Sequence, residues 1–91
     1  MFNKLKQFKD LRSQAKILQN ALALESVEYE KSGIKITMNG NMEITKLAIN
    51  TDTPKEKLEN ILTDVINETI KRVQKVMAKK VQDMGGIQGF N

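Results

Sequence analysis

The feature that most constrains this chain is a short alternating run that ends at Asn39-Gly40. From Ile34 to Met38, apolar and polar residues alternate, which places every second side chain on one face of a strand. Asn-Gly accepts the positive φ angles of a two-residue type I′ turn, so the sequence predicts a hairpin at this point. Because a hairpin alone buries too little apolar surface to be stable in water, other parts of the chain or a second copy must cover it.

Two more strands are expected around this run. Residues 25–31 alternate apolar side chains with glutamates, which is typical of an edge strand whose charges discourage pairing with another sheet. Ser32-Gly33 is expected to form the turn into the central strand. In the third strand, residues 42–50, Ile44 is out of phase with the apolar residues that follow. This indicates either a bulge near Ile44 or a sheet that is apolar on parts of both faces.

Helix-type spacing occupies the chain on both sides of the strands. After the strands, a long C-terminal helix is predicted to begin with a capping box between Thr53 and Glu56, with Pro54 at its first helical position. Its apolar residues recur every three or four positions up to Met84, so this helix of about 40 Å should overhang a three-stranded sheet. Residues 1–24 form the other helix, with an uninterrupted coiled-coil seam that consists of Phe8, Leu11, Ala15, Leu18 and Leu22.

These patterns predict an α+β fold with an N-terminal helix, a three-stranded antiparallel meander and a long C-terminal helix. At 91 residues the chain should form one domain over residues 1–84, followed by a flexible glycine-rich tail over residues 85–91. A chain of this size buries only about 60% of its unfolded surface. We therefore expect a homodimer, in which a second copy covers apolar residues left on the helices and the sheet.

Composition argues against most catalytic chemistry. The chain has no cysteine and no histidine, so it lacks the thiol nucleophile, the commonest general base and the commonest metal ligand. Glu25, Glu28 and Glu30 are best interpreted as a solvated strand edge, and the glycines match no phosphate-binding loop. We expect no enzyme activity, cofactor, metal or small-molecule substrate. Since no apolar run approaches a membrane span and the N-terminus lacks a signal-peptide core, we expect a cytoplasmic protein without membrane association.

The net charge of +4 is concentrated in two places. The N-terminal basic cluster is opposed only by Asp10 and consists of Lys4, Lys6, Lys9, Arg12 and Lys16. The C-terminal basic cluster has no acidic residue within positions 69–82 and consists of Lys71, Arg72, Lys75, Lys79 and Lys80. If the two helices pack antiparallel or splay from the same side of the sheet, these ten cations could form two edges of one surface for DNA phosphates. The four aromatic residues form no stacking platform, so duplex DNA is favoured over single strands.

Other interpretations of these features remain open. The cations could be ordinary solvated faces of two helices, or they could keep soluble a module that docks a protein partner on its helical arms. The first helix could also lie on a membrane surface, although it has no tryptophan and its apolar stripe resembles a packing seam.

The order of these elements resembles the YbaB/EbfC family of nucleoid-associated proteins. The resemblance is carried by the Ser-Gly turn, the run from Ile36 to Gly40, the closing strand from Leu47 to Asn50, and a glycine-rich ending near Gly89-Phe90. It implies a bacterial homodimer whose helical arms project from a joined sheet and bind DNA in a tweezer-like manner. It also implies location at the nucleoid and an influence on nucleoid organisation and gene expression.

Overall fold

The computed structural model describes residues 2–85, with side chains from residue 10 onward. The elements in chain order are α1 (Phe2–Ala23), β1 (Ser26–Lys31), β2 (Ile34–Asn39), β3 (Ile44–Ile49) and α2 (Lys55–Asp83). The predicted α-β-β-β-α order is confirmed. The predicted tail lies outside the described residues, apart from Gly85.

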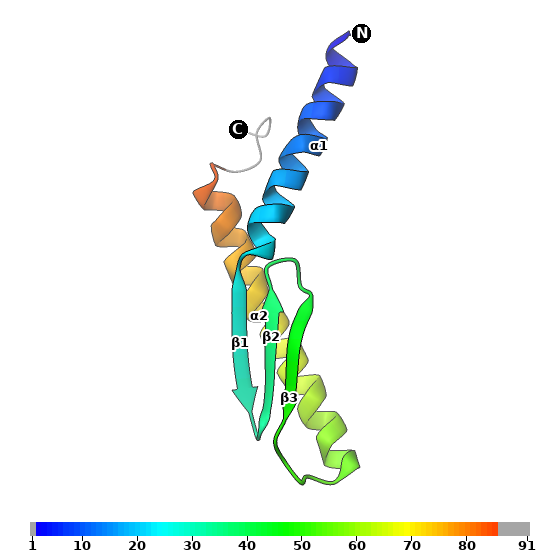
Figure 1. The fold of residues 1–91 in the computed structure, drawn as a ribbon, viewed down its shortest axis with the longest axis vertical. Coiled ribbons are helices and arrows are strands. Elements are labelled where there is room, and N and C mark those ends of the chain that lie inside the picture. The colour runs from blue at the N-terminus through cyan, green and yellow to red at the C-terminus, as the bar shows by residue number, and fades with distance from the viewer. Residues whose placement is uncertain (1, 86–91) are drawn as a thin grey trace.

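The core lies between α2 and one face of the sheet. The strands form an antiparallel meander in the order β1-β2-β3, and α2 packs mainly on β1 and β2 (Figure 1). Ile34 and Ile36 of β2 meet Val65 of α2, and all three side chains are fully buried. Each such burial stabilises the fold by about 1.5–3 kcal/mol. The alternation that predicted β2 therefore sets the face on which α2 lies.

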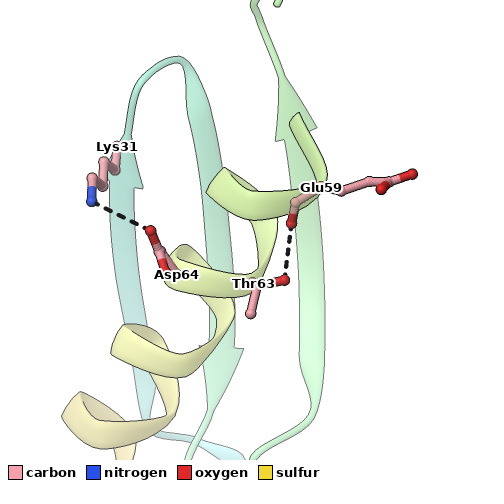
Figure 2. A network of polar contacts seen from close by, with 4 residues as sticks. All are labelled: Lys31, Glu59, Thr63 and Asp64. Atoms are coloured by element: carbon pink, nitrogen blue, oxygen red, sulfur yellow. Dashed lines mark hydrogen bonds and ion pairs between the residues drawn. The ribbon is translucent and has the colours of Figure 1, made fainter. Parts of the chain in front are cut away.

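A surface ion pair accompanies this packing at the end of β1. The Nζ atom of Lys31 lies 3.9 Å from a carboxylate oxygen of Asp64, and Figure 2 shows the two side chains pointing toward each other from β1 and α2. One helical position earlier, Thr63 Oγ1 donates a hydrogen bond to the Glu59 carbonyl oxygen within α2. Because Lys31 and Asp64 are both at least half exposed, the pair contributes little to stability compared with the apolar core.

The predicted type I′ turn at Asn39-Gly40 is wrong. The connection there runs over residues 40–43, and its positive φ angle, 61°, belongs to Met42. Asn39 organises this longer loop, because its Oδ1 accepts hydrogen bonds from the backbone N–H groups of Asn41 and Glu43. The two-residue turn with positive φ at both positions is Ser32-Gly33, at 53° and 84°.

Gly40 has a different role, which is to let the end of α1 approach the sheet. Its backbone N–H donates a 2.9 Å hydrogen bond to the carbonyl oxygen of Leu22. A Cβ atom at this position would lie 2.5 Å from that same oxygen. Leu22, the last residue of the α1 seam, is buried at this junction.

The bulge near Ile44 is confirmed. Thr37 pairs with Lys46 and Met38 with Ile44, so Thr45 is the extra residue, and its Oγ1 donates a hydrogen bond to the Thr37 carbonyl oxygen. The shift of register moves Ile44 onto the same face as the later apolar residues of β3. All the aliphatic side chains of β3 except Ala48 therefore lie on the face that carries α2.

The predicted capping box at the start of α2 is not formed. The helix begins at Lys55 with Pro54 as the N-cap residue, and no side chain caps it. The Thr53 hydroxyl instead hydrogen bonds with the hydroxyl of Thr51, which also accepts the Thr53 backbone N–H. Thr53, the predicted N-cap residue, thus stabilises the loop before α2 and does not cap the helix.

Both helices extend past the same end of the sheet and diverge there (Figure 1). The molecule measures 61 × 22 × 17 Å, and α1 and α2 contact each other only slightly. The predicted overhang of α2 is confirmed. Of the α1 seam, Leu11 and Ala15 are exposed, Leu18 is half-buried and Leu22 is buried.

Replacing Gly40 with alanine should destabilise the fold, because the added methyl group meets backbone atoms of Leu22 that cannot rotate away. We expect the free energy of unfolding to fall by about 2 kcal/mol, measured by urea denaturation. An unchanged urea midpoint would show that α1 is not held to the sheet at this point.

Candidate nucleic-acid interface

The C-terminal basic cluster lies within residues 69–82 of α2, a stretch that carries no acidic residue. Within it, Lys71, Lys75 and Lys79 are exposed and follow one another at intervals of four. On an α-helix this interval gives a row that rises about 6 Å and turns about 40° at each step. In the described part of the chain, none of the three makes an ion pair within 4 Å. They form a row of free positive charges along one side of the helix.

Arg72 has a different environment. Its guanidinium carbon lies 4.5 Å from the centre of the Tyr29 ring, within the range of a cation–π interaction. Its Nε atom also lies 3.9 Å from a carboxylate oxygen of Glu68, one turn earlier on α2. Since Tyr29 belongs to β1, Arg72 links α2 to the sheet.

Lys80 is likewise engaged. Its Nζ atom lies 3.1 Å from a carboxylate oxygen of Glu25, the residue just before β1. Both side chains are about one-third exposed, so this ion pair is less screened by solvent than the other pairs of the described chain. It ties the overhanging half of α2 to the junction between α1 and the sheet.

The N-terminal basic cluster is only partly described. The side chains of Lys4, Lys6 and Lys9 lie outside the described part, and those of Arg12 and Lys16 are exposed on α1. Because α1 and α2 diverge from the same end of the sheet, the two basic clusters lie on separate arms that point in the same general direction (Figure 1).

The acidic residues of the strand edge take part in ordinary ion pairs. Glu28 lies 3.1 Å from Lys35 across the open face of the sheet, and Glu25 pairs with Lys80. Within residues 2–85 no group of three or more acidic side chains is placed to hold a metal ion.

Sequence reasoning missed the role of Tyr29. Its place in the alternation of β1 indicated a side chain on the core face. Arg72 reaches the Tyr29 ring on that face only because α2 crosses β1. Nothing in the sequence around Tyr29 or Arg72 predicts this contact.

Comparison with known proteins identifies relatives along nearly the whole chain. Residues 1–88 match the model of the YbaB/EbfC DNA-binding family. A nucleoid-associated protein of Hahella chejuensis is 32% identical, over 88% of this chain and 79% of its own length. Another nucleoid-associated protein, from Syntrophobacter fumaroxidans, is 28% identical, over 97% of this chain and 83% of its own length. Among the helices described here, none is long and apolar enough to cross a membrane.

Replacing Tyr29 with leucine should loosen the contact between α2 and β1, whereas Tyr29→Phe keeps the ring and serves as the matched control. We expect Tyr29→Leu to unfold with a free energy about 1 kcal/mol lower than the phenylalanine variant, measured by urea denaturation. Equal stability of the two variants would mean that the ring does not hold Arg72.

Proposed function

Because this chain belongs to the YbaB/EbfC DNA-binding family, we propose that it binds duplex DNA with low sequence specificity through the basic arms of a homodimer. The observation that carries the proposal is the row of exposed lysines within residues 69–82 of α2, a stretch without acidic residues. Lysines of this kind bind phosphates by displacing condensed counterions, which gives affinity without reading the bases.

The rest of the described surface favours backbone contact over base recognition. The aromatic side chain of the described part is Tyr29, whose ring is covered by Arg72 and is not available to stack on a base. Both arms are regular helices that diverge from one end of the sheet (Figure 1). This arrangement supports contact with the phosphates of a duplex from two sides.

Dimerisation is proposed because the described part of the chain covers the apolar side chains of β3 only by about half. Ile44, Leu47 and Ile49 are 44–49% exposed, although they lie on the face that carries α2. The two edges of the sheet also differ: β1 carries alternating glutamates, whereas β3 carries a single charge, Lys46. Charged edge strands resist pairing, so a second copy would meet the sheet at β3.

The relatives' description as nucleoid-associated proteins supports a place for this chain at the bacterial nucleoid, in the cytoplasm. A homodimer that neutralises phosphates at many DNA sequences would influence nucleoid organisation and, through it, gene expression.

Reversing the charge of the lysine row should abolish DNA binding while leaving the fold intact. The test variant carries Lys71→Glu and Lys75→Glu, two lysines of the row. A control with the same change of net charge carries Lys55→Glu and Lys57→Glu, at exposed positions in the first turn of α2, away from both the row and β3. Fluorescence anisotropy with a mixed-sequence duplex at physiological salt should show binding lost in the first variant and largely kept in the second. Equal losses in both would mean that net charge, and not this row, determines binding.

Charged residues on β3 should separate the two copies. We expect Leu47→Lys with Ile49→Lys to halve the mass in solution, because buried lysines at the interface would be left without partners. The control places lysines at Asn60 and Asn67, exposed polar positions of α2. Light scattering after size exclusion measures the mass, and a β3 variant that stays dimeric would contradict an interface at β3.

A further inference from the structure

The five cations of the C-terminal basic cluster fall into two groups that differ in what surrounds them. Arg72 and Lys80 each meet a residue at or just before β1, whereas the lysine row makes no ion pair in the described chain. We propose that, within this cluster, only the row contacts phosphate, and that Arg72 and Lys80 are positioning residues that hold α2 at a fixed angle to the sheet. This inference rests on the proposed DNA binding and divides its residues by role.

The surface around the row fits a phosphate backbone. Lys71 and Lys75 of the row line one shallow hollow on α2, together with Arg72, Gln74 and Ala78. Ala78 is small, so a phosphate group can approach the helix closely between the lysines. The side-chain amide of Gln74 supplies a neutral hydrogen-bond donor of a kind that often binds phosphate oxygens. Glu68 also borders this hollow, but its carboxylate lies beside the guanidinium of Arg72. Arg72 thus reduces the repulsion between that carboxylate and DNA.

The two positioning residues act at different heights along α2. Arg72 rests on the Tyr29 ring where the helix still crosses β1, and Lys80 meets Glu25 two turns later, where the helix has passed the strand. Two attachments on one helix fix its direction as well as its position. A phosphate contact by Lys80 would require it to leave a carboxylate 3.1 Å away.

The test compares two double variants of the full chain that lose the same charge. One carries Lys75→Gln with Lys79→Gln, and the other carries Arg72→Gln with Lys80→Gln. For each, the affinity for a mixed-sequence duplex is measured at several salt concentrations, and the urea midpoint is measured separately. The slope of log affinity against log salt counts phosphate contacts, at about 0.9 for each contact.

We expect the row variant to lose about 0.9 in slope for each contact removed and to keep its urea midpoint. The variant of the positioning residues should keep the wild-type slope and show a lower urea midpoint. If that double variant does not fold, the single variants Arg72→Gln and Lys80→Gln replace it in the same comparison.

Equal loss of slope in the two variants would overturn the division of roles while leaving the proposed function in place. A row variant with the wild-type slope would also overturn it. No salt-dependent binding by the unsubstituted protein would instead overturn the proposed function and, with it, this inference.

Discussion

The packing of α2 across β1 and β2 is the interaction on which the rest of the structure depends. It buries Ile34 and Ile36 against Val65, and it fixes the line along which the remaining turns of α2 leave the sheet. The apolar residues that make this contact and the cations beyond it belong to one uninterrupted helix. The hydrophobic core therefore determines where the lysine row points, although no lysine of that row takes part in the core.

The same packing explains which surfaces remain open. One helix is too narrow to cover three strands, so β3 keeps its aliphatic side chains about half exposed. The bulge at Thr45 adds to this surface by bringing Ile44 onto the same face. Residues 2–85, which the structure describes, include no further element that covers that strand. The exposed strand is therefore the natural place for a second copy, and a dimer would present four helical arms instead of two.

Much of the fold could be predicted from the sequence because its signals are periodic. The alternation in β2, the edge charges of β1, the phase change at Ile44 and the length of α2 each follow from side chains within a single element. The errors occurred where a local signal competed with a distant contact. Position 40 needs a glycine because the backbone of Leu22 lies too close for a side chain there, and not because the chain forms a type I′ turn at this point. Thr53 hydrogen bonds with Thr51, so it is not available to cap α2.

The candidate site was predictable as a concentration of charge but not as a set of contacts. Counting charges identified both basic clusters, yet it could not separate Arg72 and Lys80 from the free lysines. Their partners, Tyr29 and Glu25, are brought to α2 only by the fold. The interval of four between Lys71, Lys75 and Lys79 is visible in the sequence. Only the fold shows that these lysines lie on the solvent side of α2, because the opposite face of the helix is buried.

The central claim is that this protein binds the phosphate backbone of duplex DNA, and the salt dependence of binding tests it most directly. An anisotropy titration of the full chain with two unrelated duplexes, repeated from low to physiological salt, measures that dependence. The account predicts similar affinities for both duplexes and a steep linear fall of log affinity with log salt, with a slope of about −0.9 for each phosphate contact. An affinity that does not change with salt, or no binding at low salt, would contradict it.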